Sequence, residues 1–181
     1  MEKKINYFAY GELKDGKILG RLLKRDMGEG EPAMLLGYQL CIQSLEGVPD
    51  YIPEGLSASA REIIRDNYGE GFRTYMVRRR SGAQVEDRIY QLCEEEVIFV
   101  DDWELTEFAW YEQNRAQAQT REGSVPVPVT VHADSTIPHH IERVVGGLLY
   151  PDLQDPEFML EIAEKSRQES LQRLSNTQRE R

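Results

Sequence analysis

The chain has 181 residues, of which 40% are hydrophobic, and its 22 basic and 32 acidic residues give a net charge of −10. This acidic balance argues against a general nucleic-acid or anionic-membrane binder. No apolar run approaches the roughly 20 residues that a membrane helix needs, and the start "MEKKINYF" lacks the apolar core of a signal peptide. Two cysteines, Cys41 and Cys93, are too few for a disulfide framework, so we expect reduced thiols in the cytoplasm.

The first half of the chain is predicted to consist mostly of strands. The apolar run 5–9 predicts a first strand, which breaks abruptly at Tyr10 and Gly11. This break is either an ordinary β-turn or a loop whose bare backbone N–H groups hold an anionic substrate. A second strand is predicted over 33–43, where "YQLCI" places alternate apolar residues on one face.

The middle of the chain is predicted to form two hairpins separated by a helix. Residues 44–72 are rich in turn formers, with a short helix near 58–65. The stretches "FRTYMVRRR" and "VEDRIYQLC" flank "SGAQ", which predicts a first hairpin. After Cys93 the apolar period is helical for about a dozen residues. The segment "RAQAQTREGSVPVPVTVHA" then predicts a second hairpin that turns at Glu122-Gly123, whose two prolines mark an edge or partly paired strand.

The last third of the chain is predicted to be helical. A helix is expected to open at Pro138, with an apolar face at i, i+3, i+4, i+7 and i+8: Ile141, Val144, Val145, Leu148 and Leu149. Asp155-Pro156 starts the final helix, whose apolar stripe fails between Ala163 and Leu171. We therefore expect one domain over 1–165 and an exposed or disordered helical tail over 166–181. Strands followed by flanking helices favour an α+β fold with a small, mixed, barrel-like sheet.

The most informative segment is "CEEEVIFVDDWELTEFAWY", at 93–111. On a continuous helix, Val97, Val100, Glu104 and Phe108 share one face, so a single carboxylate joins an apolar stripe. Burial would raise the pKa of Glu104 from about 4.3 towards the 6–7 where a general acid/base works best. The alternative is that the helix breaks near Trp103 and leaves Glu104 on the rim. The other acidic residues of the segment are explained as a solvated face and an acidic first turn.

Other candidate sites have weaker support. His132, His139 and His140 lack metal-ligand spacing and are more simply surface residues, so we expect no metal and no cofactor. Neither cysteine lies in a CxxC pair, and no GxSxG, P-loop or GxGxxG motif occurs. The basic run 78–80 is expected to be a solvated hairpin edge rather than a nucleic-acid site.

The ordered motifs "FAYGEL" (8–13) and "VDDWELTEFAWY" (100–111) resemble the gamma-glutamylcyclotransferase-like family. That family has a strand running into a "YGSN" or "YGTL" loop, followed later by "LDxxEG" and a tyrosine. Further echoes are "LLGYQL", "GVP", "DRIYQL", "AQTREG" and the helix expected at Pro138, so the resemblance spans most of 5–165.

The resemblance implies a small mixed barrel with flanking helices and a reaction that needs no metal. Glu104 would be the catalytic general acid/base, cyclising a γ-glutamyl group to 5-oxoproline with release of an amine or amino acid. Tyr10, Gly11, Glu12 and Leu13 would bind the substrate through backbone N–H groups. Tyr111 would be a pocket wall. The partner would be a small γ-glutamyl molecule, and the oligomeric state is left open.

Three residues depart from the family pattern. Glu12 stands where the family usually has Ser or Thr, Leu105 replaces a glycine, and Asp87 replaces the glycine before "RIY". A Glu12 side chain that points inward would disfavour a γ-glutamyl substrate or select a cationic part of one. Two alternatives therefore stand beside the enzyme: a non-catalytic small-molecule binder on the same fold, and an interaction module whose tail docks a partner through Leu171 and Leu174.

Overall fold

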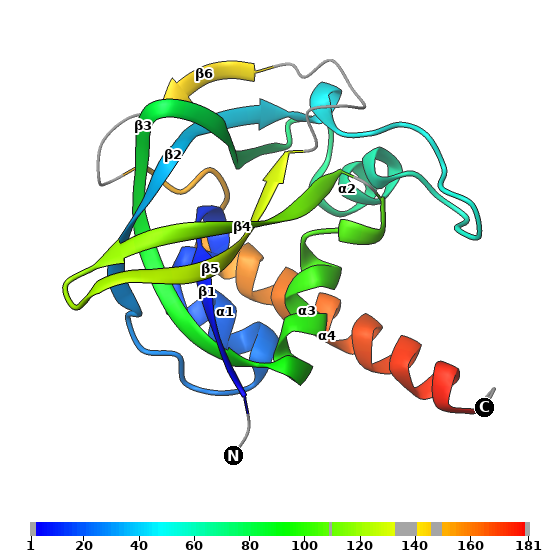
Figure 1. Cartoon of the computed structure of the whole chain (residues 1–181). Helices are drawn as coiled ribbons and strands as arrows, with labels where there is room; N and C mark the ends of the chain where they lie inside the picture. Colours follow the sequence, from blue (N-terminus) through cyan, green and yellow to red (C-terminus); the bar gives the residue numbers. More distant parts are fainter. Residues whose placement is uncertain (1–2, 109, 133–140, 146–149, 180–181) are drawn as a thin grey trace.

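The computed structural model describes residues 3–108, 110–132, 141–145 and 150–179 (Figure 1). The β-strands, in chain order, are β1 (Lys4–Ala9), β2 (Glu31–Ser44), β3 (Arg73–Cys93), β4 (Tyr111–Thr120), β5 (Gly123–His132) and β6 (Ile141–Val145). The α-helices are α1 (Gly16–Leu23), α2 (Ala60–Tyr68), α3 (Glu94–Trp103) and α4 (Pro156–Arg179). The predicted α+β class is therefore confirmed.

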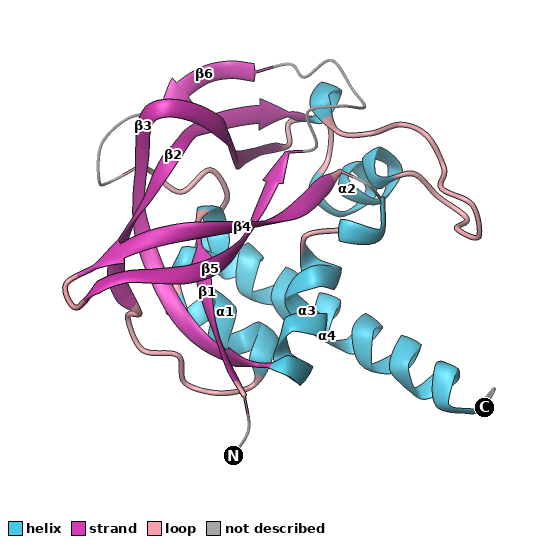
Figure 2. Ribbon diagram, viewed as in Figure 1, coloured by secondary structure: helices cyan, strands magenta, loops and turns pink. Residues whose placement is uncertain are grey.

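The strands form one antiparallel sheet in the order β1-β3-β2-β4-β5, and β6 pairs with β2 off this path (Figure 2). The sheet curls until its two edge strands, β1 and β5, come near each other. At this seam the Tyr10 hydroxyl donates a hydrogen bond of 2.7 Å to the Thr130 carbonyl. The described strands do not add a β1–β5 ladder to this contact, so the sheet is barrel-like without being closed.

The helices lie against one side of the curled sheet, where α1, α3 and α4 pack together (Figure 1). Strand β1 separates two parts of the core because its side chains alternate between faces. Phe8 points into the curl of the sheet with residues of β2, β3 and β5, whereas Tyr7 and Ala9 pack against the helices. A third cluster lies under α2 and includes Ile64 and Met76.

The predicted first hairpin is wrong, because residues 73–93 form the single long strand β3. Both halves pair with β2 in one antiparallel ladder that runs from Arg73 opposite Ser44 to Ile89 opposite Glu31. Residues 80–83 bulge opposite Gly37, so "SGAQ" lengthens one strand locally instead of reversing the chain. Gly82 within the bulge and Gly37 opposite it on β2 both adopt positive φ, which is why turn-forming residues occur within these strands.

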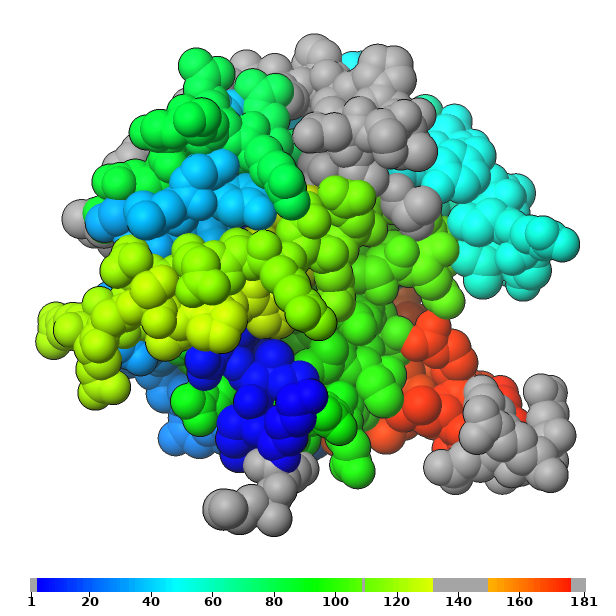
Figure 3. All heavy atoms as spheres, viewed as in Figure 1, coloured from blue at the N-terminus to red at the C-terminus, as the bar shows by residue number. Residues whose placement is uncertain are grey.

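The predicted second hairpin is confirmed as β4 and β5, which pair from Tyr111 opposite His132 to Thr120 opposite Gly123. It crosses the middle of the face shown in Figure 3. Pro126 and Pro128 lie on β5, an edge strand of the sheet. Proline lacks a backbone N–H and is tolerated there because an edge strand does not need a donor on its outer side.

The predicted helix from Pro138 is wrong where the structure can test it, because residues 141–145 form strand β6. This strand pairs with β2 between Leu40 and Gln43, on the edge of β2 that β3 leaves unpaired. Three of the five residues in "IERVV" are β-branched, and such residues favour a strand. Pro138 and Leu148-Leu149 lie outside the described residues.

The final helix begins at Pro156, as predicted, and continues to Arg179. The division of the chain at residue 165 stays a prediction, although α4 passes through it without a break. Beyond residue 165, Ser170 is buried, and Leu174 packs against the part of the core that contains Tyr7 and Ala9. Arg173 forms ion pairs with Asp102 and Glu107. None of the described helices is long and apolar enough to cross a membrane.

Candidate functional site

The loop after β1 turns sharply because Gly11 has a φ of 66°, a conformation that glycine adopts without steric cost. The chain then enters a short 3-10 helix, Gly11–Lys14, before α1 begins. The Gly11 N–H donates a hydrogen bond of 3.0 Å to the Tyr150 hydroxyl. The loop is thereby attached to the segment that precedes α4.

Glu104 lies directly after α3, which ends at Trp103. The predicted continuous helix from Val97 to Phe108 is therefore wrong, and the alternative of a break near Trp103 is right about the helix. The break occurs because Leu105 has a φ of 50°, which ends the α-helix. Glu104 does not lie on an open rim, however, because the turn aims its side chain into a cavity. Leu105 thus adopts a backbone conformation that suits the glycine of the family pattern.

A small cavity lies between the loop after β1, the end of α3, and helices α2 and α4. All six residues singled out from the sequence line it: Tyr10, Gly11, Glu12, Leu13, Glu104 and Tyr111. The remaining lining residues are mostly aromatic or aliphatic: Ile64, Tyr68, Phe72, Thr74, Tyr75, Trp103, Trp110 and Met159. The cavity volume is about 40 Å³, room for about one water molecule. A ligand of glutamyl size therefore needs the lining side chains to move apart.

Glu104 is uncharged over much of the neutral pH range. Burial raises its pKa from 4.5 to about 8, and the nearby negative charge of Glu12 adds to the rise. The Tyr7 hydroxyl donates a long hydrogen bond of 3.4 Å to Oε1 of Glu104, which opposes the rise in pKa. The pKa increase expected from burial is thus present, although it arises at a helix end and not on a helix face. A carboxyl group with this pKa can both take up and release a proton near neutral pH.

Glu12 shares the cavity and is also hard to ionise. Burial raises its pKa from 4.5 to about 7. Two contacts oppose this rise: its own backbone N–H donates to its carboxylate, and the positive charge of Lys14 lies nearby. Glu12 lines the cavity together with Glu104. Among the residues that line the cavity, none is Lys, Arg or His.

Tyr150 connects the loop to β3 on the other side of the site. Its hydroxyl accepts from the Gly11 N–H and donates to the Asp87 carboxylate. Burial raises the pKa of Asp87 to about 7, while the Tyr150 hydrogen bond and the Lys14 charge oppose this rise. The Lys14 ammonium lies 3.7 Å from the centre of the Tyr150 ring and donates to the Tyr150 carbonyl. Asp87, which departs from the family glycine, thus fixes the position of Tyr150 and, through it, the loop.

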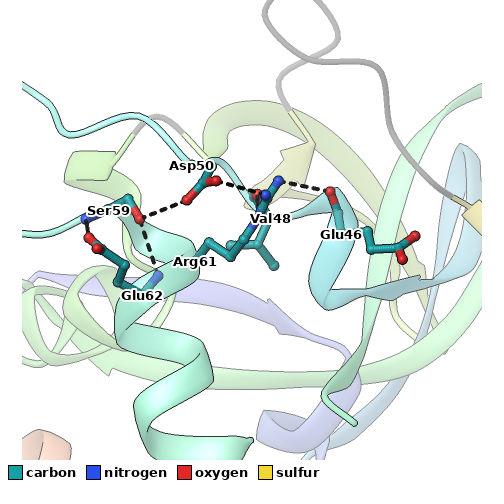
Figure 4. Close-up of polar contacts among 6 residues, drawn as sticks. All are labelled: Glu46, Val48, Asp50, Ser59, Arg61 and Glu62. Atoms are coloured by element: carbon teal, nitrogen blue, oxygen red, sulfur yellow. Dashed lines mark hydrogen bonds and ion pairs between the residues drawn. The ribbon is translucent and has the colours of Figure 1, made fainter. Parts of the chain in front are cut away.

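Helix α2 supplies one wall of the cavity through Ile64 and Tyr68. Figure 4 shows how its first turn is held. Ser59 and Glu62 form a capping box, in which each side chain accepts a hydrogen bond from the other residue's backbone N–H. Arg61 donates to the carbonyls of Glu46 and Val48 and pairs with Asp50 at 2.9 Å. These contacts position α2 over the cavity.

Sequence reasoning missed several residues of the site. The sequence pattern assigns Tyr7 to the first strand and gives it no role at the site. A tyrosine three residues before the loop is nevertheless a pattern from which a contact with the site could have been predicted. The sequence does not distinguish three aromatic residues of the site from ordinary core residues: Tyr68, Trp103 and Trp110. Only the fold shows that they line the same cavity as Glu104. Tyr150 fell within the region predicted to be helical, so its contact with the loop was not foreseen.

The described residues contain no group of three or more His, Cys, Asp and Glu side chains placed to hold a metal ion. Cys41 is buried and Cys93 is partly buried, and both are free thiols. His139 and His140 lie outside the described residues, and so does the side chain of His132. The chemistry available at the cavity is that of carboxyl groups, tyrosine hydroxyls and backbone N–H groups.

Comparison with known proteins relates this arrangement to solved structures. No family model and no curated protein matches the sequence. The chain is similar in structure to a protein titled "Gamma-glutamyl cyclotransferase", with a TM-score of 0.56 and 11% identity over 91% of this chain and 80% of that one. It is also similar to the uncharacterized protein loc79017 from Homo sapiens, with a TM-score of 0.53 and 13% identity over 92% and 81% of the two chains. The solution structure of At5g39720.1 from Arabidopsis thaliana matches at a TM-score of 0.49 and 15% identity, over 75% and 72%.

The first two likenesses, with TM-scores of 0.56 and 0.53, show that the chain has the gamma-glutamyl cyclotransferase-like fold. At 11–13% identity they show the fold alone. The fold predicted from the resemblance is confirmed. The roles of Glu104, the loop 10–13 and Tyr111 stay predictions, which the cavity geometry makes specific.

Proposed function

We propose that this chain is an enzyme that cyclises a γ-glutamyl-type acyl group to a five-membered lactam, with Glu104 as the group that moves protons. The product from an unsubstituted γ-glutamyl group is 5-oxoproline. One observation carries the proposal: the Glu104 carboxyl, with a pKa raised by burial to about 8, faces the loop Tyr10–Leu13 across an aromatic-walled cavity. Strongly shifted pKa values in a cavity are typical of catalytic carboxyl groups.

The reaction needs only proton transfer and positioning. The ionised carboxylate of Glu104 takes a proton from the substrate's ammonium group, and the freed nitrogen attacks the γ-carbonyl carbon. A C–N bond forms as the ring closes, and the bond to the leaving nitrogen breaks. In total two protons pass from the attacking nitrogen to the leaving nitrogen, so Glu104 returns to its starting state. Because attack is intramolecular, holding the folded conformer of the substrate supplies much of the rate.

The surrounding residues have separate roles in this proposal. The loop 10–13 lies beside the attacking end of the substrate, and Tyr111 forms a wall that stacks on Trp110, with ring centres 4.5 Å apart. The Tyr7 hydroxyl donates to Glu104 and orients its carboxylate. Tyr7 is a positioning residue, because it acts on the substrate through Glu104.

The test is the release of 5-oxoproline from a panel of γ-glutamyl dipeptides, γ-glutamyl amines and glutathione. Glu104→Gln keeps the shape of the side chain but cannot carry a proton, so we expect a loss of at least ~10²-fold in turnover. The matched control is Glu107→Gln, which alters an exposed glutamate that pairs with Arg173 and does not line the cavity. Turnover that survives in Glu104→Gln would contradict the assignment of Glu104.

A second candidate function is a non-catalytic small-molecule binder on the same fold. Two observations favour it: the cavity is only about 40 Å³, and the Glu12 carboxyl lines it where the family pattern has Ser or Thr. Calorimetry with the same panel separates the two functions. The binder predicts heats of binding without lactam release, and equal affinity in wild type and Glu104→Gln. Lactam release that depends on Glu104 would exclude it.

A further inference from the structure

The loop after β1 already holds a carboxylate that belongs to the protein. The Glu12 carboxyl lines the cavity, and the N–H of Gly11 donates to the Tyr150 hydroxyl. A substrate carboxylate that accepted a hydrogen bond from the Gly11 N–H would have to displace Tyr150 and lie beside the Glu12 carboxyl. Such a displacement is costly because a buried hydrogen bond is lost and two carboxyl groups are brought together.

The charge of the cavity also opposes an anionic group. Glu12 and Glu104 both line it, and the negative charge of Glu12 contributes to the raised pKa of Glu104. The other lining residues include the aromatic rings of Tyr68, Trp103 and Trp110. Carboxylates and aromatic faces attract an organic ammonium group and repel or fail to solvate an anion. Lys14, whose positive charge acts on Glu12, donates to the Tyr150 carbonyl and does not line the cavity.

We propose that the substrate carries no free carboxylate on the carbon that bears the attacking amine, because the Glu12 carboxylate takes the place of that group. The α-carboxyl is either converted to an amide or absent, and Glu12 pairs with the substrate's ammonium group. This inference rests on the proposed cyclisation and names its substrate class. Glu12 is then the residue that determines specificity, and its departure from the family Ser or Thr has a chemical purpose.

The simplest substrate of this class is 4-aminobutanamide, the analogue of glutamine without the α-carboxylate. Its amine nitrogen would form a bond to the amide carbon as the bond from that carbon to the amide nitrogen breaks. The products are 2-pyrrolidinone and ammonia, which leaves as ammonium with the two protons lost by the attacking nitrogen. Glutaminamide, whose α-carboxyl is an amide, would give 5-oxoprolinamide and ammonium in the same way.

The experiment uses a matched series of three probes: L-glutamine, L-glutaminamide and 4-aminobutanamide. Lactam and ammonia release are measured for wild type, for Glu12→Ser and for Glu54→Ser, which alters an exposed glutamate outside the cavity. We expect wild type and Glu54→Ser to favour the two uncharged probes over glutamine by at least about 10-fold in kcat/KM. Glu12→Ser should reverse this order, because it removes the Glu12 carboxyl from the cavity lining and leaves room for a substrate carboxylate. A wild-type preference for glutamine, or an order that Glu12→Ser leaves unchanged, would overturn the inference.

Calorimetric binding of the same three probes separates this inference from the proposed function. Binding that favours 4-aminobutanamide over glutamine and reverses in Glu12→Ser, without lactam release from any probe, supports the inference and contradicts the cyclisation. Lactam release that depends on Glu104 but favours glutamine supports the cyclisation and overturns the inference. If none of the three probes binds or reacts while a member of the γ-glutamyl panel releases 5-oxoproline, the cyclisation stands and the inference is overturned.

Discussion

Two glutamates at opposite ends of helix α3 have pKa values that are shifted in opposite directions. At the first turn, Glu96 accepts hydrogen bonds from the Cys93 N–H at 2.8 Å and from Arg25 Nη2 at 3.0 Å. Partial burial alone would raise the pKa of Glu96, but these contacts outweigh it and hold the pKa below its usual range. Just beyond the other end, Glu104 faces the cavity, where none of the lining residues is a cation, and burial raises its pKa to about 8.

The helix itself contributes to this contrast. Its partial positive charge lies at the end near Glu96 and its partial negative charge at the end near Glu104, so the dipole favours ionisation only at the first. Glu96 thus stabilises the fold in the way expected of a capped and paired carboxylate. Glu104 lacks that compensation, and a residue kept at a cost in stability is typical of a functional site.

The largest effect should be a gain in stability on removing the Glu104 charge at high pH. The folded state holds a proton on Glu104 between its unfolded pKa of 4.5 and its folded pKa of about 8, so wild-type stability falls as the pH rises through this window. Glu104→Gln avoids this loss. We expect the difference in free energy of unfolding between Glu104→Gln and wild type to be roughly 2–4 kcal/mol larger at about pH 9 than at about pH 5.

Urea unfolding at the two pH values measures this difference, with equal m-values as the check that both proteins unfold in the same way. The control is Glu107→Gln, which replaces an exposed glutamate that does not line the cavity. A Glu104→Gln difference that does not change with pH would show that Glu104 ionises normally, and the contrast between the ends of α3 would disappear.

A smaller effect of opposite sign is expected at the first turn of α3. Glu96→Gln weakens the pairing with Arg25 and the cap on Cys93, and should lower stability by about 1 kcal/mol at neutral pH, since the pair is partly exposed and screened. The folded pKa of Glu96 is lowered, so its contribution is present above the unfolded pKa and is lost as the pH falls through the folded pKa. Acid titration of stability for both proteins should therefore converge. A constant gap would mean that packing, and not charge, causes the loss.

The sequence predicted those parts of the fold that local pattern controls. The first two strands, the β4–β5 hairpin and the start of the last helix follow from alternation, a glycine turn and Asp155-Pro156. It failed where partners distant in sequence decide. Residues 73–93 look like two strands around a turn until β2 is seen to pair with both halves. Residues 141–145 suit a helix face equally well until the open edge of β2 selects a strand.

The candidate site divides in the same way. The order of the motifs predicts six site residues, and all six line one cavity: Tyr10, Gly11, Glu12, Leu13, Glu104 and Tyr111. The prediction that Glu104 lies on the apolar face of a continuous helix is wrong, because the positive φ of Leu105 ends the helix. The partners that define the chemistry, Tyr7 and Tyr150, meet Glu104 and the loop only through long-range packing. Sequence spacing cannot supply such contacts, since they depend on how the sheet curls.

Glu104 is a carboxyl group whose pKa is raised mainly by burial and further by the negative charge of Glu12, with which it shares the cavity. Carbon-13 NMR of the glutamate side-chain carboxyls as a function of pH tests this most directly, with the Glu104 signal assigned by its loss in Glu104→Gln. We expect a midpoint of about 8 in wild type. In Glu12→Gln the midpoint should fall by about one pH unit, because a negative charge is removed. A midpoint near 4.5, unaffected by Glu12→Gln, would contradict the account.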